Sequence, residues 1–273
     1  MEHTLTPLQA KLLESLKWFD AFCKEHNLRY YAVGGTLLGA MRHQGFIPWD
    51  DDIDLGMPRR DYETLKEYAK TEKGRFRFEA YDSEAKDYCY PINKLYDSST
   101  TLVEHKRTDV VRGVFIDIFP IDGIGNTLEE GIENYKSVER AYMFHEAMVD
   151  GVRKGRAFFK NAAVIACKLI PSFIFNKRSA RIKLNSICAK HDFDNSKFGG
   201  NLIGAYGRRE IMDLSLFGTP QYYQFEDMMI AGPEKADEYL THIYRDWRKL
   251  PPKEKQVSHH DFVKLDLENG YLT

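Results

Sequence analysis

The sequence has few cysteines, and none of them are paired in a motif. Its 273 residues contain four, Cys23, Cys89, Cys167 and Cys188. No two of them have the CxxC spacing, which argues against a zinc knuckle and against a disulfide framework. Scattered cysteines of this kind are typical of a reducing compartment.

The sequence also lacks an apolar run long enough to span a bilayer. The longest candidate, Ala157 to Phe175, is interrupted by lysine, asparagine and proline. We expect a buried helix there, with contact at a membrane face as the alternative. The N-terminus lacks the charged-then-apolar pattern of a signal peptide. We therefore expect a cytoplasmic protein, and a peripheral contact with the inner face of the cell membrane stays open.

An excess of charge of one sign is absent too. The formal net charge is -2, which argues against a nucleic-acid partner because such proteins carry basic surfaces. Hydrophobic residues make up 43% of the chain and charged residues 29%, so a packed core is expected and wholesale disorder is not. The length fits one large domain, or one domain with an appended helical part.

The spacing of apolar residues predicts a mixture of helices and strands. The segment Pro7 to Glu25 has helical spacing, with Thr6 as N-cap and Pro7 in the first turn. The other expected helices cover 36–42, 61–69, most of 129–192, and 234–244. Strands are expected at 28–33, 52–57, 75–80, 90–96 and 113–119, and an irregular tail follows residue 252.

The most informative segment is Gly34 to Leu55, GGTLLGAMRHQGFIPWDDDIDL. Four carboxylates in five positions repel one another, so a fold keeps them mainly where a cation neutralises them. Asp52 and Asp54 are two residues apart on an expected strand and therefore leave the same face. Asp117, on the strand at 113–119, is the candidate third ligand. Such carboxylates can hold one or two Mg²⁺ ions. A solvated acidic loop is the alternative. The adjoining Gly-Gly turn and the apolar alternation favour the metal site.

Gly34 and Gly35 lie between an expected strand and an expected helix. In that position backbone N–H groups can bind a phosphate, although a glycine pair is more often an ordinary turn. Thr36 is either a contact to the ligand or the N-cap of the helix. Phosphate-binding glycines followed by metal-binding carboxylates suggest phosphoryl or nucleotidyl transfer.

Two cations are candidates for binding phosphate. Arg42 can clamp a phosphate with two hydrogen bonds, and a surface ion pair with an aspartate is the alternative. Lys94 lies in a strand-like segment and can face a phosphate, with a solvated lysine on an edge strand as the alternative.

The roles of several neighbouring residues stay open from sequence alone. Asp50 and Asp51 either serve the site or hold the loop. Trp49 can contribute to an aromatic box for a quaternary ammonium group, although most aromatic residues must be core. His259 and His260 are expected at the surface.

The segment GGTLLGAMRHQGFIPWDDDIDLGMPRRDYE resembles the opening signature of the LicD family of phosphotransferases, which includes bacterial phosphocholine transferases and, more distantly, the fukutin-type ribitol-phosphate transferases. Three later segments also resemble the family: KLYDSSTTLVE from Lys94, GVFIDIFPID from Gly113, and YRDWRKLPP from Tyr244. The resemblance covers most of the chain. Arg245 departs from it, because glycine is expected in a YGD-like turn.

The resemblance implies an α/β (α+β) fold of the nucleotidyltransferase type, a mixed sheet flanked by helices with an additional mainly helical region. It implies a single catalytic domain over 1–273, composed of a core (1–128), a helical insertion (129–200) and a C-terminal substrate-loop region (201–273). Gly34 and Gly35 then form the phosphate-binding turn. Asp52 and Asp54 bind the metal together with Asp117.

The expected function is transfer of phosphocholine from CDP-choline, with Mg²⁺ or alternatively Mn²⁺, onto a sugar hydroxyl. The acceptor would be teichoic acid, capsule or lipopolysaccharide, or a lipid-linked precursor of one of them. Arg42 and Lys94 would stabilise the phosphates and the departing CMP. Glycerol-phosphate or ribitol-phosphate from its CDP donor is the alternative cargo. An inactive relative that binds nucleotide or glycan is the alternative of a different class.

Overall fold

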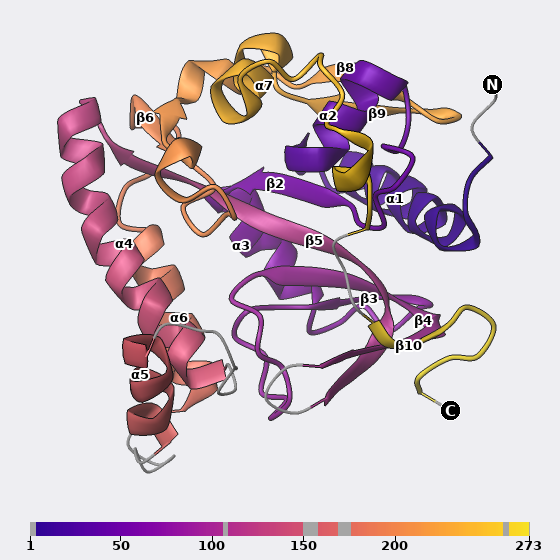
Figure 1. Cartoon of the computed structure of the whole chain (residues 1–273), viewed down its shortest axis with the longest axis horizontal. Helices are drawn as coiled ribbons and strands as arrows, with labels where there is room; N and C mark the ends of the chain where they lie inside the picture. The colour runs from indigo at the N-terminus through magenta and orange to yellow at the C-terminus, as the bar shows by residue number, and fades with distance from the viewer. Residues whose placement is uncertain (1–3, 106–108, 150–157, 169–175, 259–261, 273) are drawn as a thin grey trace.

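The computed structural model describes residues 4–105, 109–149, 158–168, 176–258 and 262–272. Its centre is a curled mixed sheet flanked by helices (Figure 1). Five strands form the main path in the order β1 (Tyr31–Ala32), β2 (Asp54–Pro58), β5 (Asp109–Gly125), β4 (Asn93–His105) and β10 (Phe262–Asp266). Strand β3 (Phe76–Glu79) pairs with β4, while β6 (Phe198–Gly200) and β7 (Met212–Asp213) extend the sheet from the end of β5.

The sheet is mixed because β2 and β5 run parallel while its other strand pairs among the described residues are antiparallel. This confirms the expected fold class. A separate hairpin of β8 (Gln221–Phe225) and β9 (Met228–Gly232) lies beside the sheet. Since parallel neighbours need a crossover connection, β2 and β5 come from distant parts of the chain.

Strand β5 is apolar on both faces and divides the interior. Val114, Ile116 and Ile118 belong to one apolar cluster, whereas Phe115 belongs to another. This alternation was expected from the sequence GVFIDIF. Asp117 is the one charged residue within that run, so the strand holds a carboxylate at a fixed place between the two cores.

Helix α1 (Pro7–Glu25) has the bounds that its sequence predicts. Thr6 caps it: the Thr6 side chain accepts a hydrogen bond from the Gln9 backbone N–H, and the Gln9 side chain accepts one from the Thr6 backbone. The buried face of α1 includes Leu12, Leu16 and Phe19, which pack into the same cluster as Val114.

The remaining helices fall into two groups (Figure 1). α2 (Gly34–His43), α3 (Arg59–Tyr68) and α7 (Ala236–Tyr244) contribute to the cluster of α1. α4 (Leu128–Val149), α5 (Phe158–Lys168) and α6 (Lys177–Cys188) pack against one another along a different side. Three short 3₁₀ turns complete the described elements: η1 (Gly207–Glu210), η2 (Leu214–Leu216) and η3 (Lys253–Lys255).

The C-terminal tail differs from the expectation. Its described part contains the 3₁₀ turn η3 and strand β10, which pairs antiparallel with residues 101–104 of β4. Five residues with two charges carry too weak a local signal to predict a strand. The free edge of β4 supplies the hydrogen-bonding partners instead, which is a tertiary effect.

Other boundaries differ in smaller ways. The strand expected at 28–33 spans only two residues, and the strand expected from residue 52 begins at Asp54. β4 and β5 are 13 and 17 residues long, well beyond the expected 90–96 and 113–119. Each continues because a neighbouring strand provides partners: β4 pairs with residues 109–118 of β5, and β2 and β6 pair with the rest of β5. The division of the domain at residues 128 and 200 stays a prediction.

In the described part of the chain, no helix is both long and apolar enough to cross a bilayer.

Candidate active site

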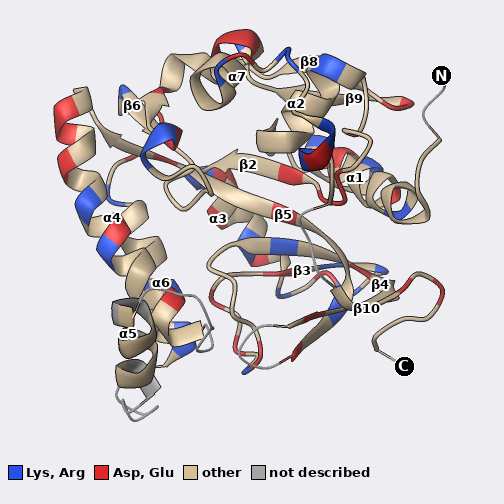
Figure 2. Cartoon of the chain, in the orientation of Figure 1, with Lys and Arg blue, Asp and Glu red and all other residues tan. Residues whose placement is uncertain are grey.

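The pairing of β2, β5 and β4 places three charged side chains side by side. Asp54, at the start of β2, is in register with Asp117 on the parallel strand β5. Asp117 is in turn in register with Lys94 on the antiparallel strand β4. Figure 2 shows the acidic positions at the start of β2 and, next to it, along β5. Asp52 lies just before β2 and acts on Asp54 through its charge. The three carboxylates that the sequence singles out therefore belong to one neighbourhood.

The pKa of Asp54 shows that it is unfavourable to keep these carboxylates ionised side by side. Burial raises its pKa well above the usual range, and the negative charges of Asp52 and Asp117 raise it further. The positive charge of Lys94 opposes this shift but does not cancel it. A group in this position gains from a bound cation, which would replace repulsion by attraction.

The carboxylates around Asp54 fit an Mg²⁺ ion that takes part of its coordination from a substrate. Among the described residues, no three His, Cys, Asp or Glu side chains are arranged to hold a metal ion by themselves. Mg²⁺ in phosphoryl-transfer sites is commonly held by one or two carboxylates together with substrate phosphates and waters. The carboxylates of Asp52, Asp54 and Asp117 fit a metal that is held partly by the substrate.

Lys94 is buried inside the sheet, with 2% of its surface exposed. Its Nζ lies 2.6 Å from Oδ1 of Asp117, 3.4 Å from the ring centre of Phe115 and 4.0 Å from that of Tyr90. The alternative of a solvated lysine on an edge strand is therefore wrong. The partner in the structure is Asp117, and the expected contact between Lys94 and a phosphate stays a prediction.

The Gly-Gly turn fits closely around the carboxylates. Gly34 has φ of 55°, and a Cβ atom there would lie 3.2 Å from Oδ2 of Asp54. A Cβ atom on Gly35 would lie 2.9 Å from Oδ2 of Asp50. Glycine at position 34 adopts the left-handed backbone without strain. The missing Cβ atoms of Gly34 and Gly35 leave room for the carboxylates of Asp54 and Asp50.

Thr36 has a different role from the expected N-cap. Val33 is the N-cap of α2, so Thr36 lies inside the helix. Its hydroxyl accepts a hydrogen bond of 2.8 Å from the backbone N–H of Asp54. Thr36 therefore fixes the first residue of β2 relative to the Gly-Gly turn.

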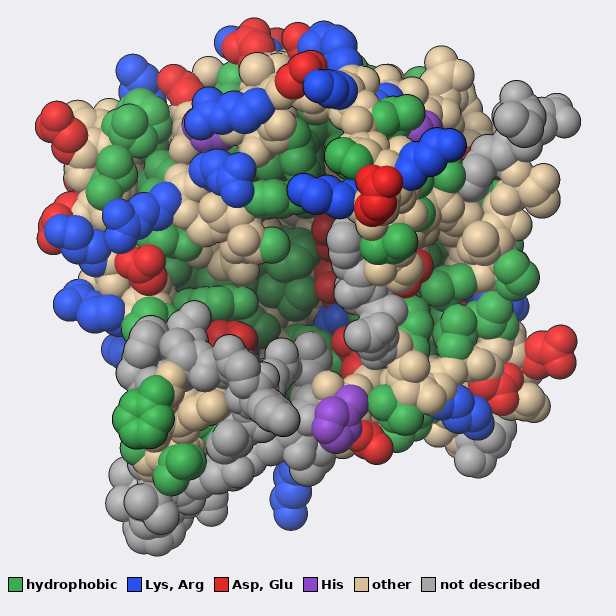
Figure 3. Space-filling view, in the orientation of Figure 1, with side chains coloured by type: hydrophobic (Ala, Val, Ile, Leu, Met, Phe, Trp, Pro, Cys, Tyr) green, Lys and Arg blue, Asp and Glu red, His purple; other side chains and the backbone are tan. Residues whose placement is uncertain are grey.

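The Gly-Gly turn, Asp52 and Asp54 line a pocket of about 680 Å³, within the usual size for a ligand site. Figure 3 shows it as a central hollow with acidic side chains inside and basic side chains along its upper rim. The carboxylates that line it are Asp50, Asp51, Asp52, Asp54, Asp246 and Glu254. The aromatic residues are Trp49, Tyr206, Tyr244 and Trp247, the cations are Arg42, Lys249 and Lys255, and Gly34 and Gly35 line it as well.

Asp50 and Asp51 have structural contacts besides lining the pocket. The backbone carbonyl of Asp50 accepts a hydrogen bond of 2.9 Å from Nε2 of Gln9, on helix α1. The carboxylate of Asp51 accepts one from the hydroxyl of Ser258, on the C-terminal segment. The aspartate loop is thus held between the first helix and the last segment of the chain.

One wall of the pocket was not foreseen from the sequence. Tyr206 and Tyr244 are joined by a side-chain hydrogen bond, with ring centres 5.2 Å apart in an edge-to-face arrangement. Trp247 is buried and donates from Nε1 to Asp237, and its carbonyl accepts from Arg42. About 150 residues separate this wall from the aspartates, and only the segment YRDWRKLPP gave a signal for it.

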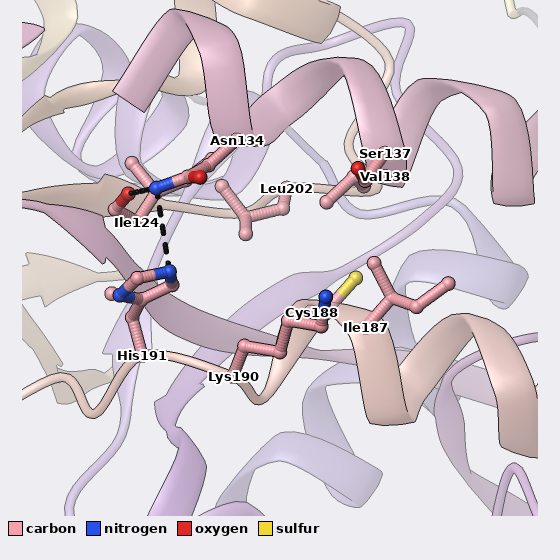
Figure 4. A pocket seen from close by; sticks show the side chains of 10 residues that line it. Ile124, Asn134, Ser137, Val138, Ile187, Cys188, Lys190, His191 and Leu202 are labelled. Carbon is pink, nitrogen blue, oxygen red and sulfur yellow. Dashed lines mark hydrogen bonds between the residues drawn. The ribbon is translucent and has the colours of Figure 1, made fainter. Parts of the chain in front are cut away.

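A second hollow lies between α4 and the end of α6 (Figure 4). Its volume is about 30 Å³, and Nδ2 of Asn134 lies 3.3 Å from Nε2 of His191 across one side. That volume holds a single water molecule rather than a substrate. His259 and His260 lie outside the described residues, as do parts of the stretch from Ala157 to Phe175.

Residues 27–156 match the family described as LicD/FKTN/FKRP, nucleotidyltransferase domain. The match covers a little under half of the chain. Its range contains the Gly-Gly turn, the aspartate loop, Lys94 and Asp117, so the resemblance inferred from the sequence is confirmed. The wall formed by residues 205–257 lies outside this range.

Individual relatives agree with this result. The chain is 28% identical over 261 residues to the lipopolysaccharide cholinephosphotransferase LicD of Haemophilus influenzae, covering 94% of this chain and 96% of that protein. It is 36% identical over 63 residues to the human ribitol 5-phosphate transferase FKRP, covering 23% of this chain and 13% of that protein. It is 25% identical over 119 residues to mannosyltransferase regulator 4 of Saccharomyces cerevisiae, covering 40% and 10%.

Proposed function

We propose that this protein transfers phosphocholine from CDP-choline to a sugar hydroxyl of a cell-surface glycan or of its lipid-linked precursor. The observation that carries the proposal is the pocket, in which Asp52 and Asp54 face an aromatic wall. The similarity to a cholinephosphotransferase over nearly the whole length of both chains supports it. The coarser statement, that the chain is an enzyme of the phosphotransferase class, is confirmed by the family match and the relatives.

The proposed reaction is a single displacement at phosphorus. The acceptor hydroxyl attacks the phosphorus that carries choline, a new P–O bond forms, and the bond to CMP breaks with its electron pair leaving on CMP. Asp117 accepts the proton of the hydroxyl. Asp52 and Asp54 would hold Mg²⁺, or alternatively Mn²⁺, which would supply charge neutralisation at the donor's phosphates. The Gly-Gly turn brings backbone close to the same phosphates.

The choice of choline as cargo rests on the aromatic wall. A quaternary ammonium group binds to aromatic ring faces by cation–π attraction. Guanidinium groups already lie over two of the four rings, Arg209 over Tyr206 and Arg248 over Trp247. Trp49 and Tyr244 are therefore the rings that we assign to the ammonium group. Asp246 and Glu254, which also line the pocket, add negative charge that favours a cation.

Ribitol-phosphate and glycerol-phosphate are the alternative cargoes. A transferase of ribitol 5-phosphate is among the relatives, although the matched segment is short. These polyols would be recognised by hydrogen bonds rather than by ring faces. The acceptor class that we propose includes lipopolysaccharide, capsule and teichoic acid. A cytoplasmic position, with peripheral contact at the membrane that carries a lipid-linked acceptor, belongs to the same proposal.

A transfer assay tests the proposal. Purified protein with Mg²⁺ and choline-labelled CDP-choline, offered lipopolysaccharide or lipid-linked glycan, should move label to the glycan and release an equal amount of CMP. Asp52→Ala should abolish both, because it removes a carboxylate from the phosphate-binding end. The matched control is Asp227→Ala, an exposed residue on the turn between β8 and β9 that pairs with Lys17. It should retain full activity.

Three outcomes would contradict the proposal. Full transfer activity in Asp52→Ala would show that the carboxylate pair of Asp52 and Asp54 is not needed for transfer. Turnover of CDP-glycerol or CDP-ribitol with no turnover of CDP-choline would show that the transferred group is glycerol-phosphate or ribitol-phosphate and not phosphocholine. No turnover of any donor together with no Mg²⁺ binding would favour the inactive relative, against which the clustered carboxylates argue.

A further inference from the structure

The pocket carries side chains of both charges. The aspartate loop lines it with carboxylates, beginning with Asp50. The segment between α7 and β10 adds Lys249 and Lys255 as well as Asp246 and Glu254. Figure 3 shows acidic side chains inside the hollow and basic side chains above it. A ligand that fills this pocket therefore meets carboxylates at the aspartate loop, and both lysines and carboxylates at the segment between α7 and β10.

The two lysines have no competing partner among the described residues. Neither ammonium group takes part in an ion pair or side-chain hydrogen bond there, and both side chains are exposed. Two other cations near the pocket are engaged. Lys94 pairs with Asp117, and Arg248 pairs with Asp237.

Arg42 lines the pocket but is also partly engaged. Its Nη1 donates a hydrogen bond of 2.9 Å to the carbonyl of Trp247, and its Nε lies 3.0 Å from Nε2 of His43. Arg42 therefore fastens α2 to the C-terminal segment. The positive charge that remains available to a ligand at the rim is that of the two lysines.

The backbone around the lysines is held by local hydrogen bonds. The N–H of Lys249 donates to the carbonyl of Asp246, and the N–H of Lys255 donates to the carbonyl of Pro252. The Gln256 side chain donates to the carbonyl of Pro251. Two consecutive prolines with fixed φ stiffen the link between the lysines. Both ammonium groups therefore extend from an ordered segment, which reduces the entropic cost of binding a ligand.

We propose that Lys249 and Lys255 bind the phosphate that stays on the nucleotide, while the inner carboxylates hold the transferred phosphate through the divalent cation. This inference rests on the proposed function and names what its pocket recognises, which is the two adjacent phosphates of a diphosphate bridge. The lysines thereby stabilise the negative charge that develops on CMP as the bond breaks. In this assignment Lys249 and Lys255 stabilise the departing CMP, which is the role that the sequence analysis expects of Arg42 and Lys94.

Binding measurements test the assignment without any need for turnover. Isothermal titration is carried out with Mg²⁺-pyrophosphate, CMP and CDP-choline on wild type and on the double variant Lys249→Met, Lys255→Met. The matched control is Lys253→Met, since Lys253 is an exposed lysine in the same 3₁₀ turn that does not line the pocket. The double variant should bind CMP and pyrophosphate about tenfold more weakly, because two exposed charge contacts are lost. The control should change affinity less than twofold.

The outcomes separate this inference from the proposed function. Unchanged affinities in the double variant would overturn the role of the lysines, whichever donor the protein uses. An equal loss in Lys253→Met would overturn it too, because a general loss of positive charge would then explain the result. A third outcome is that the wild type binds pyrophosphate and CMP through the two lysines but does not bind CDP-choline. This result would support the role of the lysines and contradict the proposed donor.

Discussion

At the residue scale, Arg245 occupies a backbone conformation that suits glycine. It follows the last residue of α7 with φ of 65° and ψ of -110°, a region that residues with a Cβ atom rarely adopt. The family resemblance leads one to expect glycine at this position. The structure therefore keeps the turn that glycine would make, and the arginine is held in it at some cost in stability.

Arg245→Gly should stabilise the protein by about 1 kcal/mol and raise the melting temperature by roughly 2–4 °C, because it relieves the strained φ. Differential scanning calorimetry measures both. Arg245→Ala is the matched control, since it removes the same side chain but keeps the Cβ atom. It should bring no gain, and an equal gain in both variants would show that the side chain and not the backbone is responsible.

Lys94 is the second residue with a prediction of its own. Replacing it by methionine, which has similar volume, leaves Asp117 without its cation beside Asp54. We expect the free energy of unfolding to fall by about 3 kcal/mol, as when one partner of a buried ion pair is removed. Chemical denaturation measures this loss.

The double variant Lys94→Met, Asp117→Asn serves as the control. It should lose clearly less stability than the sum of the two single variants, because the uncompensated carboxylate is gone. Strict additivity would mean that the 2.6 Å contact between Lys94 and Asp117 contributes nothing.

At the scale of elements, the sequence could predict what local patterns determine. Helix α1 has the expected bounds because cap, proline and apolar spacing all agree within one segment. The alternation in β5 gave both of its faces, and hence the position of Asp117. Strand β10 and the wall containing Tyr206 could not be predicted, because each depends on a partner far away in the sequence. The same limit hid the ion pair of Lys94, which only the register of β4 and β5 creates.

Element η1 provides a prediction about pH. It ends at Glu210, which is 5% exposed, and burial raises the pKa of this carboxyl to about 7. The folded state therefore binds more protons than the unfolded state between the usual pKa of about 4.5 and 7. The stability due to Glu210 is present at acid pH and is lost as the pH rises through 7. The difference amounts to about 3 kcal/mol.

Glu210→Gln should remove this slope. Chemical denaturation of wild type and variant from pH 5 to pH 8 gives the difference in the free energy of unfolding at each pH. That difference should shift in favour of the variant as the pH rises, because only the wild type must take up a proton or bury a charge when it folds. A difference that stays constant across the range would contradict the assignment of the raised pKa to Glu210.

At the scale of the whole molecule, the pocket joins the two ends of the chain. The aspartate loop is held by α1 through Gln9 and by the C-terminal segment through Ser258. The same segment then continues to β10, which pairs with β4 next to the strand that holds Asp117. The carboxylates of the aspartate loop could be predicted from one stretch of sequence, whereas the aromatic wall and the lysines beside it required the fold.

The central claim is that Asp52, Asp54 and Asp117 form a site for a divalent cation shared with a diphosphate donor. The most direct test is thermal unfolding of wild type and Asp54→Asn, with and without Mg²⁺, in the presence of CDP-choline, CDP-glycerol, CDP-ribitol or CMP. Wild type should gain at least about 5 °C with Mg²⁺ and one donor at roughly 100 times its Kd, because only the folded state binds them. Asp54→Asn should be more stable than wild type without metal, since repulsion is relieved, and should show no metal-dependent gain. Equal responses of the two proteins to Mg²⁺ and donor would contradict the account.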